Sequence, residues 1–126
     1  ARTQRLRALG DASAEALREP LEAAIEAAPR TIVLTHVPPF QAACWYEGST
    51  SHPEWWPYFT CAAVGRVLRE AAERRPDRTI EVLCGHTHNA GVAEILPNLT
   101  VRTGGAEYGA PEVQSAIPLA STGLPE

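Results

Sequence analysis

Two short apolar segments rich in β-branched residues constrain this chain more than any other feature. "TIVLT" spans residues 31–35 and "TIEVLC" spans residues 79–84. The first lacks polar alternation, which is typical of a strand covered on both faces, so we expect an inner strand of a parallel sheet. A helical pattern lies between the two segments. A strand, a helix and a second strand predict a βαβ unit, and hence an α/β fold.

The N-terminal segment has the apolar spacing of an amphipathic helix over residues 3–28. Glycine and proline inside it predict interruptions. We expect Gly10 to close a first short helix and Asp11 or Ser13 to cap the next one. Pro20 then predicts a kink or a restart of the helix.

The rest of the chain predicts one more helix and further strands. Residues 61–75 carry an apolar stripe at helical spacing, preceded by Thr60 as the expected cap. The segments 92–96 and 99–103 flank a Pro-Asn pair and predict an antiparallel β-hairpin. Residues 113–119 are a candidate for a third strand. The expected fold is therefore a βαβ unit followed by a hairpin.

Composition excludes several functional classes. The 126 residues suffice for one domain, which we expect to span 1–126 with a flexible tail at 121–126. A net charge of −4 argues against a broad basic surface for nucleic acid. The sequence has no apolar segment of the roughly 18 to 20 residues that cross a bilayer, so no membrane association is expected. Three cysteines at unrelated spacings do not suggest a disulfide framework, which favours a cytoplasmic protein.

Three of the four histidines follow the two predicted strands directly. His36 comes after the first strand, and His86 and His88 come after the second. Open α/β sheets place their ligand sites at the carboxyl ends of the strands, so these side chains are expected to converge. Any one of them has an ordinary interpretation as a loop histidine bonded to backbone. Together, at matched strand ends, they predict a metal site, because neutral imidazole is a common ligand of divalent ions.

The motifs "LTHVPP" and "CGHTH" resemble the last two motifs of the calcineurin-like metallophosphoesterases. The resemblance covers roughly residues 31–109. It implies that His36 and His86 bind one metal ion and His88 the other, in a pair of divalent ions of manganese, iron, nickel or zinc. It also implies a metallophosphoesterase-type α/β sandwich, of which this chain would be the C-terminal half.

The resemblance does not extend to the N-terminal motifs of that family. The Asp-x-His, Gly-Asp and Gly-Asn-His motifs are absent, and the pair Gly10-Asp11 lies in a helical segment instead of following a strand. We therefore expect a partial domain whose partner is an N-terminal half of the same protein. The complete protein would hydrolyse a small phosphoester through a two-metal activation of water, and this chain alone would be inactive.

Two other functions stay open at this point. A non-catalytic binding or scaffold module could keep the fold without the chemistry. A nuclease would share the metal site but would require a cationic groove, which the net charge does not suggest.

Substrate contacts are expected from two loops. The segment 40–59 leaves from beside the first histidine and is rich in aromatic residues, which either stack on a flat substrate group or form a small secondary core. Trp45 and His52 are the candidates in this loop. Glu107 and Tyr108, in "GGAEYG", would approach the metals or the substrate if their loop folds back.

Overall fold

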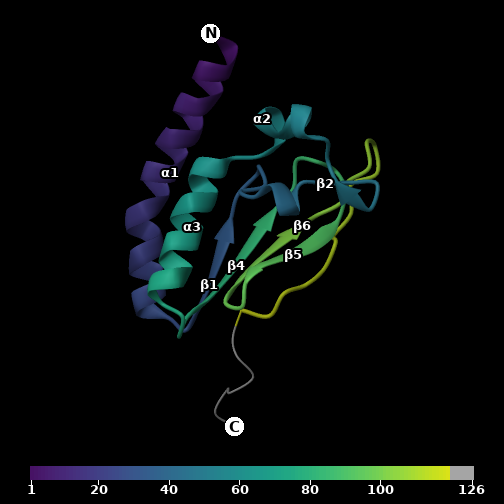
Figure 1. Cartoon of the computed structure of the whole chain (residues 1–126). Helices are drawn as coiled ribbons and strands as arrows, with labels where there is room; N and C mark the ends of the chain where they lie inside the picture. Colours follow the sequence, from purple (N-terminus) through teal and green to yellow (C-terminus); the bar gives the residue numbers. More distant parts are fainter. Residues whose placement is uncertain (120–126) are drawn as a thin grey trace.

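The chain folds as a mixed α/β structure, described for residues 1–119 by a computed structural model (Figure 1). Four strands form one sheet in the order β1-β4-β6-β5. Their bounds are Arg30–Leu34 for β1, Thr79–Cys84 for β4, Gly91–Leu96 for β5 and Leu99–Thr103 for β6. The expected tail at 121–126 lies outside the described residues.

The predicted βαβ unit and the hairpin are both confirmed. Strands β1 and β4 pair in parallel, with helix α3 (Ala62–Arg74) between them in the chain. Strand β6 then pairs in parallel with β4 and antiparallel with β5. The sheet therefore directs the ends of three strands, and the beginning of β5, toward a single edge.

The third candidate strand, at 113–119, was wrong. This segment forms no strand within the described chain. It is held instead by Arg30, whose Nη1 donates a 2.6 Å hydrogen bond to the carbonyl of Pro118. Pro118 has no N–H to contribute to a strand ladder, which disfavours a strand here.

Strand β1 lies at the edge of the sheet, which corrects the expectation of an inner strand. Among the described residues it pairs with β4 alone. Thr31 and Val33 face the helices and are buried, whereas Leu34 is 77% exposed. The uninterrupted apolar run misled the prediction, because such a run predicts cover on both faces and only one face is covered here.

Helix α1 (Arg2–Ala27) runs without a break, so the predicted interruptions were wrong. Gly10 stays within the helix, and Ser13 bonds back to the Leu9 carbonyl at 2.9 Å instead of capping a new helix. Pro20 also lies inside the helix, at a cost of about 3 kcal/mol. The burial of Leu21 directly after it offsets this cost through contacts with the core.

Helix α3 confirms the predicted amphipathic helix but not its cap. Its N-cap is Cys61 without a side-chain cap bond, and the expected cap Thr60 has a buried hydroxyl with no partner among residues 1–119. The Cys61 amide instead donates to the Pro38 carbonyl at 2.9 Å. The start of α3 is therefore tied to the segment that follows β1.

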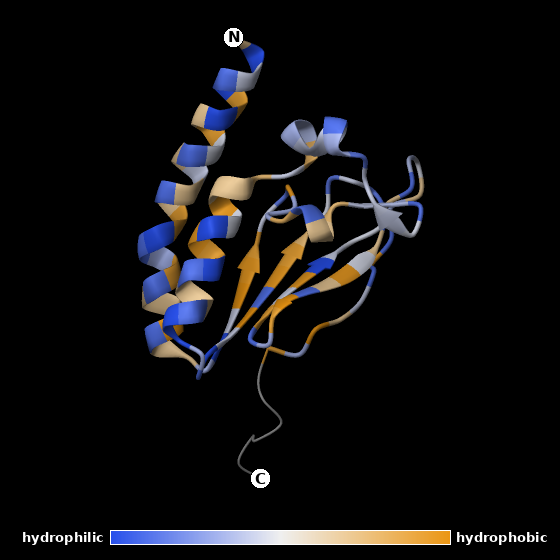
Figure 2. Cartoon of the chain, viewed as in Figure 1, coloured by the Kyte–Doolittle hydropathy of each residue, from blue (hydrophilic) through white to orange (hydrophobic). Residues whose placement is uncertain are grey.

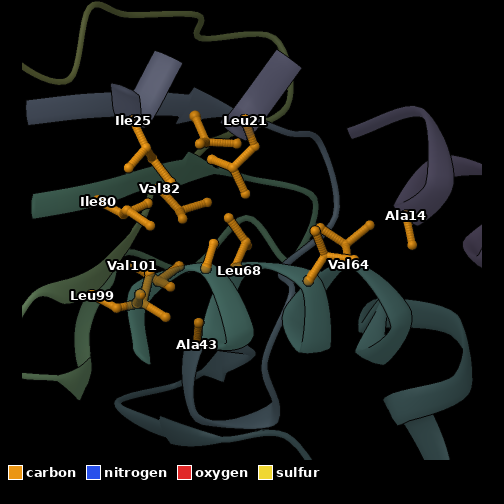
Figure 3. Close-up of a cluster of buried hydrophobic side chains, with 14 of the residues drawn as sticks. Ala14, Leu21, Ile25, Ala43, Val64, Leu68, Ile80, Val82, Leu99 and Val101 are labelled. Carbon is orange, nitrogen blue, oxygen red and sulfur yellow. The ribbon is translucent and has the colours of Figure 1, made fainter. Parts of the chain in front are cut away.

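The core lies between the sheet and the layer formed by α1 and α3, which lie side by side (Figure 1). Figure 2 shows that the strands are largely hydrophobic and that hydrophilic residues dominate the outer side of α1. The close-up of the core shows side chains from both helices meeting those of the sheet (Figure 3). The fully buried members include Leu68, Ile80, Val82, Leu99 and Val101.

The opposite face of the sheet is partly polar. On it Glu81 accepts from Arg30 at 2.7 Å and lies 3.7 Å from Arg102. These three residues come from β1, β4 and β6, so one carboxylate links three strands across the face. A half-buried ion pair of this kind sets the register more than it adds stability.

Asn98 links the β5–β6 turn to the end of α3 and to the segment before β4. Its Nδ2 lies within hydrogen-bond distance of three carbonyls, those of Ala72, Arg75 and Arg78, at 2.9, 3.1 and 3.0 Å. The first two belong to the end of α3, and the third precedes β4. One amide in the β5–β6 turn therefore satisfies carbonyls that the helix end leaves free.

We expect Asn98→Ala to lower the free energy of unfolding by about 1 to 3 kcal/mol, because buried carbonyls lose their donor. Asn98→Asp should cost more than Asn98→Ala, since it places a carboxylate oxygen against three carbonyl oxygens. Urea unfolding followed by circular dichroism measures both. Equal stability of wild type and Asn98→Ala would contradict this role.

Candidate functional site

The two strands that precede the histidines end side by side. The Thr35 amide donates to the Leu83 carbonyl at 3.0 Å, and the Gly85 amide donates to the His36 carbonyl at 3.0 Å. Parallel pairing thus continues past both strand ends. His36 and His86 each stand two residues beyond their strands, but the register sets His36 opposite Gly85, so His86 follows one residue further along the same sheet edge.

The imidazoles of His36 and His86 are in direct contact. His36 Nε2 and His86 Nδ1 are 3.0 Å apart, and the ring planes meet at 65°. The other nitrogen of His86, Nε2, donates to the Tyr58 carbonyl at 3.1 Å, because a carbonyl only accepts. Nδ1 of a neutral His86 then carries no hydrogen and accepts the hydrogen bond from His36 Nε2.

The Phe59 ring supports this arrangement from the side. Its centroid lies 4.9 Å from that of His86. Together with the Tyr58 carbonyl it fixes the rotation of the imidazole. A histidine whose one nitrogen donates to a carbonyl, which leaves an acceptor lone pair on the other, has the usual orientation of a metal-binding imidazole.

The turn that carries His86 and His88 is conformationally strained. Both residues have positive φ, 69° and 62°, which side chains other than glycine rarely adopt. The strain is held by neighbouring backbone, because the Gly104 amide bonds to the Cys84 carbonyl at 2.8 Å and the Ala106 amide to the His88 carbonyl at 3.1 Å. Strain of this kind, retained by its surroundings, is typical of functional sites.

His88 is not brought into the pair. Its ring packs edge-on against Tyr108, with centroids 4.8 Å apart. This contact and the hydrogen bond from the Ala106 amide to the His88 carbonyl show that the loop of "GGAEYG" folds back toward the turn, as far as His88. Tyr108 is otherwise 89% exposed. The ring of His86 therefore contacts His36, whereas the ring of His88 contacts Tyr108.

The distance between the two paired nitrogens is compatible with a shared metal ion. Two ligand nitrogens about 2.1 Å from one ion, at an angle of about 90 to 110°, are about 3.0 to 3.4 Å apart. The observed 3.0 Å between His36 and His86 fits two ligands of a single ion. Binding would require His36 in the tautomer with hydrogen on Nδ1, leaving Nε2 free.

The fit covers only part of a metal centre. Within residues 1–119, no three side chains of His, Cys, Asp or Glu gather as an ion-holding group. Glu107 is exposed in its loop and does not complete one with the histidines. The described residues therefore supply a two-histidine corner, and any further ligands would have to come from another segment or chain.

The remaining candidates lie in the loop after β1. Trp45 packs its pyrrole edge directly on Gly91, where β5 begins, and an added Cβ at that glycine would collide with the ring. His52 caps a short 3₁₀ turn, where Nδ1 accepts from the Glu54 amide at 3.4 Å. Neither residue joins the histidine pair. Both line a cavity beside it.

This loop is ordered by bonds to the sheet edge. Thr103 Oγ1, at the end of β6, donates to the Ala43 carbonyl at 2.7 Å. Asn89 accepts from the Glu47 amide at 3.2 Å and donates to the Thr87 carbonyl at 2.8 Å. The loop after His36 is thus attached to the turn that carries the other two histidines.

The cysteines do not take part in this site. Burial raises the pKa of the Cys84 thiol, and its 3.4 Å contact with Thr103 opposes this only in part. Cys44 is fully buried against Ser51. The Cys84 thiol therefore stays protonated at neutral pH, and both side chains pack as small core residues.

Sequence reasoning did not single out Tyr58 and Phe59 as the residues that orient His86. The bond uses the Tyr58 carbonyl, which no sequence pattern distinguishes from any other carbonyl. Phe59 stood at the end of the expected aromatic loop, and its position against the imidazole depends on where that loop returns to the sheet.

Comparison of the chain with models of known protein families, with characterised proteins and with solved structures finds no match. The resemblance to the metallophosphoesterases therefore stays a prediction made on the motifs. No helix in the described part of the chain has the length and apolar character to span a membrane.

The loop position depends on Gly65 of α3, where a Cβ would collide with the Pro39 carbonyl. We expect Gly65→Ala to lower the free energy of unfolding by about 1 to 3 kcal/mol, because the segment after His36 must move away. Gly85→Ala is the matched control, since a Cβ there meets nothing within 4 Å. Thermal unfolding of both variants measures the difference, and equal losses would contradict the close contact.

Proposed function

We propose that this chain is the C-terminal, metal-holding part of a phosphoester hydrolase of the metallophosphoesterase type. The observation that carries the proposal is the His36–His86 pair at the ends of adjacent parallel strands, with nitrogens 3.0 Å apart. The motif resemblance and the strained, backbone-held turn support the same assignment. The finer fold, half of an α/β sandwich, belongs to this proposal as well.

Each residue would have a distinct role in the chemistry. His36 Nε2 and His86 Nδ1 would hold one divalent ion, and the Tyr58 carbonyl would keep His86 in the tautomer that leaves Nδ1 free. His88 would serve the second ion of the proposed pair after its ring leaves Tyr108. A bound pair of divalent ions supplies polarisation of the phosphate oxygens and an activated water.

The alternative is a non-catalytic binding module. It is favoured by one observation, that the two imidazoles already satisfy each other and the Tyr58 carbonyl without an ion. In that case the pair acts as a structural link between the ends of β1 and β4. Metal binding separates the two candidates.

We expect zinc to bind the purified chain weakly at a single site, because two neutral ligands are fewer than the three that catalytic zinc sites use. Titration followed by the imidazole signals in NMR should shift His36 and His86 together. His86→Ala should weaken binding by at least about tenfold through loss of a ligand. His52→Ala is the matched control, and a change of equal size there would contradict the assignment.

We expect the chain to hydrolyse p-nitrophenyl phosphate only when an N-terminal half with the acidic motifs is present, with added manganese, iron, nickel or zinc. His86→Ala should abolish that activity. The assay compares wild type and His86→Ala of the longer protein side by side with manganese. Equal rates would overturn the role of His86, and rapid turnover by the 126-residue chain alone would show that the N-terminal acidic motifs are not needed.

A further inference from the structure

An open cavity of about 370 Å³ lies next to the histidine pair. Its size falls within the range of small-molecule sites and suits one planar ring system. The cavity is formed largely by the loop that follows β1. Its lining residues are Trp45, Tyr46, Ser51, His52, Trp55, Phe59 and Thr87.

The lining is aromatic and carries no acidic side chain, lysine or arginine. Five of its members have planar rings, and the remaining two are hydroxyl residues. A phosphate or carboxylate would find no cationic partner there. A neutral planar group, by contrast, would gain stacking contacts.

Two of the aromatic rings are too exposed to serve as a secondary core. Trp55 is 55% exposed and Tyr46 is 56% exposed. The alternative from the sequence, that the loop aromatics merely pin the loop, describes Trp56 better, because its Nε1 donates to the Ser51 carbonyl at 3.0 Å. Large apolar rings left in contact with water around a cavity mark a binding surface.

The cavity wall is held in place before any ligand arrives. The Ser51 amide donates to the Cys44 carbonyl at 2.8 Å, and Cys44 Sγ lies 2.9 Å from Ser51 Oγ. Trp45 is fixed on Gly91 at the start of β5. A preformed wall reduces the ordering cost of binding.

The cavity and the histidine pair share residues. Phe59 lines the cavity and also contacts the His86 ring, with centroids 4.9 Å apart. Thr87 lines it from the turn between His86 and His88. A group in this cavity therefore lies beside the imidazoles.

We infer that this cavity binds an uncharged aromatic ring, and that the ring is the organic part of the phosphoester whose phosphate faces His36 and His86. The second clause rests on the proposed function, while the first does not. The ring would stack on Trp55 and Phe59, with the ester oxygen directed toward the histidine turn. This selects aromatic phosphoesters, those of nucleosides or of aryl alcohols, over sugar phosphates.

The test uses calorimetric titration of the metal-free chain with adenosine, phenol and ribose, each without phosphate. We expect the two aromatic probes to bind and ribose not to bind. Tighter binding of adenosine assigns a nucleoside ester, and tighter binding of phenol assigns an aryl ester. Trp55→Ala should weaken binding of the aromatic probes by about fivefold or more, and Trp55→Phe should restore most of it.

Leu9→Ala is the control, because this exposed side chain lies on α1 and does not line the cavity. Circular dichroism confirms that each variant is folded. Failure of both aromatic probes to bind wild type, or equal affinities of wild type and folded Trp55→Ala, would overturn the inference. Because no metal or phosphate is present, these results are independent of zinc binding by His36 and His86, so the two proposals fail separately.

Discussion

The parallel pairing of β1 with β4 is the interaction on which the candidate site depends. Its register places Leu34 opposite Leu83, and the hydrogen bond from Gly85 to the His36 carbonyl extends the ladder beyond the strands. Past the strands this register sets His36 opposite Gly85, and His86 is the next residue along. Backbone pairing thus brings His36 and His86, 50 residues apart in the chain, close enough for their rings to touch.

A second constraint comes from the loop that leaves beside His36. It crosses the sheet edge, is anchored by Thr103 and Asn89, and returns to α3 through the bond between Cys61 and the Pro38 carbonyl. Because the loop is tied at both ends and in the middle, it builds one wall of an aromatic cavity and also delivers the Tyr58 carbonyl to His86. Orientation of the imidazole and shape of the cavity share one cause.

The two faces of the sheet differ in how they are covered. One face is covered by two helices, whereas the other carries the Glu81 ion pairs and the exposed Leu34. The two-histidine corner is incomplete as well, since the described residues provide two ligands and no acidic one. Both features agree with the proposal that a further half completes the sheet layer and the metal centre.

The sequence by itself determined the order of the βαβ unit and the hairpin. Apolar periodicity predicted the strand at 79–84, the helix at 61–75 and the hairpin, because the spacing of apolar residues reflects which face of an element is buried. Motif position predicted that His36 and His86 meet. Tertiary structure alone decided that α1 continues through Gly10 and Pro20, because contacts with the core outweigh local helix preference. It also decided that His88 turns toward Tyr108 and that β1 lies at an edge, since both depend on neighbours distant in the chain.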